Sequence, residues 1–205
     1  YGLDPTSGNT VIVFNNANPT PRSVHAANPC TGNSSSATVG KMGSATVAVL
    51  ARNFQARNLT FKNSYVEGSY TDLNQSAVAL ALRGDKAILE NVSIIGNQDT
   101  LYIGAGNSTT VMRAYIKNSF IQGDTDFIFG PGTAVFHGAT LQSTGARIGA
   151  SGSGYVSAPS TQPGNAYGFL AISSTFNSGG GTLANTTYLG RAWDQGLPAP
   201  ASWRR

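Results

Sequence analysis

A five-fold apolar repeat constrains the fold of this chain more than any other feature. In each unit, apolar residues stand four and two positions before one anchor residue and three positions after it. All fifteen of these positions are apolar, and the position five after the anchor is always small or polar. Successive anchors are 20 to 35 residues apart, and they are Asn58, Asn91, Asn118, Gly138 and Ser173.

The spacing within a unit predicts a strand, a tight bend at the anchor, and a second strand. Apolar residues two apart lie on one face of a strand, and the change of phase at the anchor marks the bend. Units of this length point to a solenoid, and short strands with small polar corners favour a parallel β-helix. An Asn-rich corner can satisfy backbone groups along such a stack.

Other fold classes fit the pattern less well. A β-sandwich would show hairpin turns between antiparallel strands. A doubly wound fold would need long amphipathic helices, whereas the sequence offers a helical pattern only as a short turn at residues 77–82. The prediction is therefore an all-β protein built as a single solenoid.

Two aspartates occupy the same place in successive units of the repeat. Asp99 follows its anchor by eight residues, and Asp126 follows the next anchor by eight. If the coils stack in register, the two carboxylates lie close together, which favours one proton between them and separate acid and base roles. Acidic residues number nine in all, yet Asp99, Asp124 and Asp126 lie in two short apolar segments. The simpler alternative is that Asp99 and Asp126 are turn aspartates that bind backbone amides.

Composition narrows the classes of partner. Only 11% of residues are charged, against about 25% in an average protein, and 40% are hydrophobic, which suits a turn-rich β protein of the secreted kind. The net charge of +4 favours an anionic partner, but the basic residues are scattered and form no nucleic-acid stripe. No apolar run is long enough to span a membrane, and no signal peptide is visible. The single cysteine, Cys30, cannot form a disulfide within this sequence, so it is either a buried free thiol or the partner of a cysteine outside this sequence.

Four segments make the chain resemble the pectin methylesterase (pectinesterase) family, in its bacterial form. Residues 98–102 read QDTLY and residues 123–130 read GDTDFIFG, which match the two aspartate motifs of the family. Residues 188–193 read YLGRAW and match its arginine motif, with Ala192 where many members carry proline. Residues 75–80 read QSAVAL and match its upstream glutamine segment.

The resemblance covers residues 47–193 and implies the family's fold, a right-handed parallel β-helix. The whole chain, 1–205, is then one pectinesterase-like domain that lacks both ends. The implied activity is hydrolysis of the methyl esters of galacturonate in pectin by an aspartyl esterase that needs no metal or other cofactor. The implied partner is that anionic polysaccharide, with no nucleic acid, and the implied state is a secreted, cell-surface or periplasmic monomer without a transmembrane segment.

The matching motifs assign a role to each candidate catalytic residue. By resemblance, Asp126 is the nucleophile that attacks the ester carbonyl, and Asp99 is the general acid that protonates methanol and then the base that activates water. Gln98 and Gln75 donate amide hydrogens to the tetrahedral oxyanion. Arg191 holds Asp126 ionised and oriented, ideally through a two-pronged contact.

Three aromatic residues match family positions that line the sugar-binding cleft. They are Tyr102, Phe129 and Trp193. Several candidates have a simpler structural explanation: the rings can be core residues, Gln75 can be an ordinary loop amide, and Arg191 can pair with Asp194 in a local salt bridge.

Three other kinds of function are compatible with a β-helix of this kind: another pectin-active enzyme (a lyase or a polygalacturonase), an esterase with another substrate, and a non-catalytic binding protein. A pectin lyase needs calcium-binding carboxylates and a polygalacturonase needs several clustered aspartates, whereas the acids here form a single stacked pair. An esterase or thioesterase with the same catalytic set but another substrate stays open, because the cleft loops decide the substrate. A non-catalytic carbohydrate-binding surface protein would be expected to have lost Asp99, Asp126 or Arg191, and all three are present.

Overall fold

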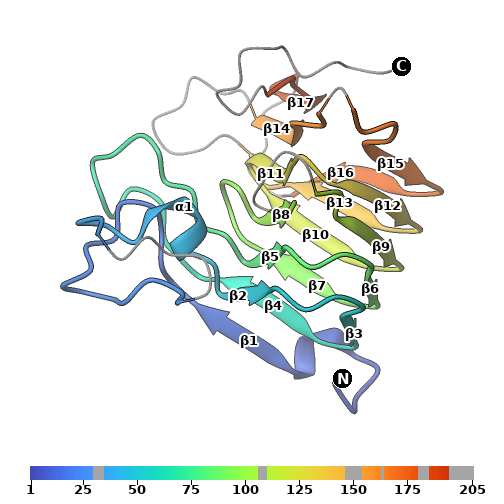
Figure 1. Cartoon of the computed structure of the whole chain (residues 1–205), viewed down its shortest axis with the longest axis horizontal. Coiled ribbons are helices and arrows are strands. Elements are labelled where there is room, and N and C mark those ends of the chain that lie inside the picture. The colour runs from blue at the N-terminus through green and yellow to red at the C-terminus, as the bar shows by residue number, and fades with distance from the viewer. Residues whose placement is uncertain (30–34, 106–109, 146–153, 163, 180–184, 194–205) are drawn as a thin grey trace.

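Three parallel sheets, wound as successive coils, make up nearly all of the regular structure (Figure 1). The chain passes from one sheet to the next and returns after each coil, so that each strand pairs in parallel with the strand one coil away. The predicted right-handed parallel β-helix is confirmed. This computed structural model describes every residue except 30–34, 106–109, 146–153, 163, 180–184 and 194–205.

The strands fall into three stacks that share one order along the helix axis. The first sheet contains β1 (Val11–Phe14), β4 (Thr60–Asn63), β7 (Ser93–Ile95), β10 (Phe120–Gly123), β13 (Thr140–Ser143) and β16 (Thr175–Ser178). The second, called the site sheet below, contains β2 (Val47–Val49), β5 (Leu80–Leu82), β8 (Leu101–Ile103), β11 (Thr125–Gly130), β14 (Gly154–Pro159) and β17 (Thr187–Gly190). The third contains β3 (Gln55–Arg57), β6 (Ala87–Glu90), β9 (Arg113–Lys117), β12 (Thr133–His137) and β15 (Phe169–Ile172).

The five anchors are the bends between the third sheet and the first, as their spacing predicts. Each has a left-handed backbone, with φ between 49° and 63°. Asparagine and glycine tolerate this region better than other residues, which accounts for most of the anchor types. The corner also forms a ladder, since Nδ2 of Asn91 donates to Oδ1 of Asn58 at 2.8 Å.

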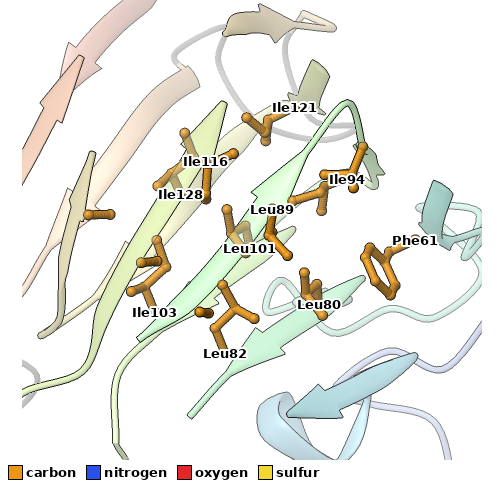
Figure 2. Packing of buried hydrophobic residues seen from close by; sticks show 14 of the residues in the cluster. Phe61, Leu80, Leu82, Leu89, Ile94, Leu101, Ile103, Ile116, Ile121 and Ile128 are labelled. Atoms are coloured by element: carbon orange, nitrogen blue, oxygen red, sulfur yellow. The ribbon is translucent and has the colours of Figure 1, made fainter. Parts of the chain in front are cut away.

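The core lies between the sheets and follows the apolar positions of the repeat. Phe61, Ile94, Ile121 and Leu141 pair rung by rung in the first sheet and are buried. Figure 2 shows how the first three approach side chains from the other two sheets inside the coil. Burial of each such side chain contributes about 1.5–3 kcal/mol, so the stack of rungs supplies most of the stabilisation.

The predicted helical turn at residues 77–82 is wrong. Leu80–Leu82 form strand β5, and all three side chains are buried. Because β5 lies within a parallel sheet that is covered on both faces, its sequence is a continuous apolar run and lacks the alternation of a half-exposed strand.

In the described part of the chain, two short helical segments lie outside the stacks: η1 (Ser7–Asn9) and α1 (Gly40–Gly43). Helix α1 is fixed beside the site sheet, because Oγ of Ser44, the residue after it, accepts a hydrogen bond from the backbone N–H of Val78 at 3.1 Å. Within the described residues, no helix is long and apolar enough to cross a membrane.

Candidate active site

Asp99 and Asp126 lie on adjacent rungs of the site sheet, as their shared position in the repeat predicts. Leu101 pairs with Ile128, so the residues two positions before them, the two aspartates, lie side by side. The backbone N–H of Asp99 also donates to the carbonyl of Thr125 at 3.0 Å. Both residues are buried, with exposed fractions of 1% for Asp99 and 6% for Asp126.

Both aspartates have a left-handed backbone just before their strands become regular. Their φ angles are 62° for Asp99 and 51° for Asp126. The pairing of β11 with β14 is also irregular between Thr125 and Ile128. Aspartate tolerates this conformation, and irregular strand pairing commonly redirects a side chain near a functional site. The local backbone therefore takes both carboxylates out of the regular alternation of the sheet.

Arg191 binds Asp126 through two parallel hydrogen bonds. Nε donates to Oδ1 at 2.9 Å and Nη2 donates to Oδ2 at 2.6 Å. This fork geometry matches the two oxygens of a carboxylate, and such bidentate pairs are among the stronger charge-assisted contacts in proteins. The same hydrogen bonds raise the pKa of Arg191 above its ordinary value, so the guanidinium stays charged. Asp194, the alternative partner considered from the sequence, lies outside the described residues, as does Cys30.

Asp99 lies in a different environment from Asp126. Its Oδ2 accepts a hydrogen bond from Oγ of Ser76 at 2.5 Å and lies 2.8 Å from Nζ of Lys41. Burial raises the pKa of Asp99, while Lys41 and Ser76 act in the opposite direction. The two carboxylates are therefore differentiated: one is paired with a guanidinium and the other is buried with a raised pKa, the pattern expected of a base or nucleophile beside an acid.

The two glutamines are oriented by hydrogen bonds to their amide oxygens. Oε1 of Gln75 accepts from the hydroxyl of Tyr65 at 2.8 Å and from the backbone N–H of Gly68 at 2.7 Å. Oε1 of Gln98 accepts from the backbone N–H of Gln75 at 3.0 Å. With each oxygen held in this way, the NH₂ group is the end of each amide suited to donate to an oxyanion.

The three aromatic candidates form one cluster next to the aspartates. Tyr102 and Phe129 are buried, with ring centres 5.1 Å apart, and Trp193 is partly exposed, with its ring centre 6.0 Å from that of Phe129. Helix α1 contributes to this cluster through Met42. Trp193 is thus the ring with a solvent-facing part, and Tyr102 and Phe129 lie beneath it as supporting packing.

Sequence reasoning missed Lys41 and Ser76. Lys41 lies in α1, outside the repeat, so no spacing relates it to Asp99. Ser76 follows Gln75 directly, and that adjacency was a usable signal. In the described part of the chain, no group of three or more His, Cys, Asp or Glu side chains gathers as a metal site would require.

Fold and site together define a class: parallel β-helix proteins that hold two stacked, buried aspartates on one sheet, one of them bound by an arginine. Comparison with known proteins gives the family. The pectinesterase family model matches residues 25–196. A pectinesterase of Ralstonia solanacearum is 68% identical over 203 residues, which are 99% of this chain and 51% of that protein. The chain belongs to the pectinesterase family.

Solved structures agree with this family. Rice weevil pectin methyl esterase has a TM-score of 0.82 at 32% identity, over 96% of this chain and 56% of that one. A pectin methylesterase crystallised in complex with a hexasaccharide has a TM-score of 0.76 at 30% identity, over 93% of this chain and 54% of that one. The chain spans about half the length of the relatives that it matches.

Proposed function

We propose that the protein hydrolyses the methyl esters of galacturonate units in pectin and releases methanol. The observation that carries this proposal is the bidentate contact of Arg191 with Asp126 on the rung next to Asp99. A carboxylate is a weak nucleophile, so it needs a fixed geometry, a charge partner and an oxyanion site. Arg191 supplies the partner, and the oriented amides of Gln75 and Gln98 supply the donors.

In the first half-reaction, an Asp126 oxygen attacks the ester carbonyl carbon. The negative charge that develops on the carbonyl oxygen is stabilised by the NH₂ groups of Gln75 and Gln98. The bond from that carbon to the methoxy oxygen then breaks, and the carboxyl proton of Asp99 goes to the methoxy oxygen, giving methanol. Galacturonate is left joined to Asp126 as an anhydride, and Asp99 is left ionised.

In the second half-reaction, Asp99 takes a proton from water, and the resulting hydroxide attacks the same carbonyl carbon. The bond to Asp126 breaks, and Asp126 leaves as a carboxylate that Arg191 stabilises. Asp99 is protonated again, and the product is a galacturonic acid unit, whose carboxyl proton passes to water and leaves galacturonate. Both aspartates return to their starting protonation states, so the cycle closes.

The substrate assignment is supported by family and by charge. A pectin methylesterase of the same fold was crystallised with a hexasaccharide, and a net charge of +4 suits a polymer that becomes anionic as its esters are removed. Trp193, the partly exposed ring beside the site, is a natural stacking surface for a sugar. A polymer of the plant cell wall also requires an enzyme that acts outside the cell that makes it, so we propose that the protein is secreted.

The function is tested by comparing products from highly methylated pectin. We expect methanol in proportion to new carboxylates, with neither unsaturated ends nor new reducing ends. Unsaturated ends would identify a lyase, and new reducing ends a polygalacturonase. If the folded protein releases no methanol but hydrolyses acyl-CoA thioesters or simple aryl esters, the pectin assignment is wrong and the catalytic set serves another ester.

A further inference from the structure

Lys41 links the carboxyl of Asp99 to the aromatic cluster. Its Nζ lies 2.8 Å from Oδ2 of Asp99, and 5.3 and 5.2 Å from the ring centres of Phe129 and Trp193. The lysine side chain is 32% exposed, whereas the aspartate side chain is only 2% exposed. A cation over two ring faces has a restricted range of positions, so the ammonium is held in place independently of the carboxylate.

The two oxygens of the Asp99 carboxylate are not equivalent. Among the described residues, its two hydrogen-bonding partners, Lys41 and Ser76, both contact Oδ2. An ammonium group donates hydrogen bonds and accepts none. The carboxyl oxygen that contacts it therefore accepts a hydrogen bond there and cannot point a proton of its own toward the ammonium. The carboxyl proton is therefore directed away from Oδ2.

Ser76 alone could not impose this asymmetry. Its hydroxyl also lies 2.6 Å from Oδ1 of Asn74, so it can donate there and accept a proton from Asp99 instead. The ammonium of Lys41 cannot reverse its role in this way, because it cannot accept a hydrogen bond. The lysine is thus the contact that decides which oxygen carries the proton.

We propose that Lys41 is a positioning residue that acts through Asp99: its ammonium occupies Oδ2 and leaves Oδ1 as the atom that gives a proton to methanol and later takes one from water. This inference rests on the proposed function, and it goes beyond it by naming the oxygen that works and the side chain that selects it.

The electrostatics of Asp99 agree with this role. Asp99 must be protonated for the first half-reaction and ionised for the second. Burial and the neighbouring charge of Asp126 raise its pKa, and Lys41 lowers it more than Ser76 does. Among the residues that the structure describes, the other charged group that faces the pair is Arg191, which is bound to Asp126. Lys41 therefore keeps the ionised form accessible in a site where burial alone would favour the acid.

The test compares Lys41→Met and Lys41→Arg with the wild type in the intact protein. Methionine keeps the apolar stem beside Phe129 and Trp193 and removes the charge, whereas arginine keeps the charge. In Lys41→Met we expect kcat/KM near neutral pH to fall by about 10–100-fold, and the alkaline limb of its pH profile to move up by about one pH unit or more. Lys41→Arg should keep the alkaline limb within a few tenths of a unit of wild type.

A second readout does not depend on activity. The ¹³C NMR signal of the Asp99 carboxyl carbon is followed as a function of pH, and it is assigned by its disappearance in Asp99→Asn. The pH midpoint of this titration should be higher in Lys41→Met than in the wild type. Lys117→Met is the matched control, because Lys117 is an exposed lysine 3.8 Å from Glu90. An Asp99 midpoint that is unchanged in Lys41→Met, or that moves equally in Lys117→Met, overturns the proposal. A wild type that releases no methanol contradicts the proposed function instead, and the NMR comparison is unaffected by that result.

Discussion

Arg191 and Asp126 are 65 residues apart in sequence and form a two-pronged ion pair, with Nε to Oδ1 at 2.9 Å and Nη2 to Oδ2 at 2.6 Å. The arginine follows β17 and the aspartate is the second residue of β11, so two coils of the β-helix must stack in register before the pair can form. The folding of the solenoid thereby places a cation beside a buried carboxylate whose side-chain partner, among the described residues, is this arginine.

Replacing Arg191 by lysine should separate the effect of charge from that of geometry. Lysine keeps the positive charge but cannot bind both carboxylate oxygens in the same plane, so we expect kcat to fall by about 10²-fold with a smaller change in KM. The measurement is initial rates of methanol release. Arg113→Lys is the control, because Arg113 binds Asp85 through the same pair of atoms away from the site. Equal losses in the two variants would show that the Arg191 effect is on stability alone.

Gln98→Ala tests the oxyanion site. Removal of one preoriented donor commonly costs about 10²–10³-fold in kcat, because the interaction forms only as charge develops on the carbonyl oxygen. Gln142→Ala, on β13 of the first sheet, should leave kcat within twofold of wild type. A Gln98→Ala enzyme that raises KM and keeps kcat would show that the amide binds the ground state and has no role at the oxyanion.

Asp99 should make stability fall as pH rises. Burial raises the pKa of Asp99 in the folded protein above its ordinary value of 3.8, so the folded state binds more protons than the unfolded chain between those two pKa values. The free energy of unfolding therefore decreases as pH rises through that window, and Asp99→Asn removes the decrease. Urea unfolding at a series of pH values from about 4 upward should show that the free energy of unfolding of Asp99→Asn increases relative to that of the wild type.

Asp85 provides the contrast of opposite sign. Its hydrogen bonds with Arg113 lower its pKa to about 2, so its contribution to stability is present above its ordinary value and is lost as pH falls toward about 2. As pH rises from about 2 to 3.8, the free energy of unfolding of Asp85→Asn should therefore decrease relative to that of the wild type. If Asp99→Asn behaves like Asp85→Asn, the raised pKa of Asp99 is refuted.

The apolar rungs should dominate the stability of the solenoid. Ile94 is fully buried in the first sheet, and truncation to alanine should cost about 2–5 kcal/mol. Ile88 is 44% exposed on the third sheet, and the same truncation there should change stability by no more than about 0.5 kcal/mol. Denaturant unfolding of the two variants measures both, and similar losses would mean that the outward face of the third sheet is covered in solution.

The repeat made most of the fold predictable from the sequence. The bends at Asn58, Asn91 and Asn118 and the apolar rungs around them follow from residue type and spacing alone. The stacking of Asp99 on Asp126 follows from the same register. The error at residues 77–82 arose because an apolar run covered on both faces carries no alternation, so a strand and a short helical turn look alike.

The part of the site that lies outside the repeat could not be predicted. Lys41 approaches Asp99 only because the segment around α1 is attached to the site sheet by contacts distant in sequence, such as that of Ser44 with Val78. Neither the spacing nor the composition of that segment encodes the contact. The burial of Tyr102 and Phe129 depends on the same covering segment, so their matching motif positions did not show which ring would face solvent.

The proposed role of the Asp126 carboxylate as the nucleophile is tested most directly by the rate of methanol release from highly methylated pectin by wild type and by Asp126→Asn. Asparagine keeps the shape of the side chain and removes its negative charge. We expect a loss of about 10³-fold or more in kcat with an unchanged circular dichroism spectrum. A folded Asp126→Asn protein that releases methanol within tenfold of the wild-type rate would contradict it.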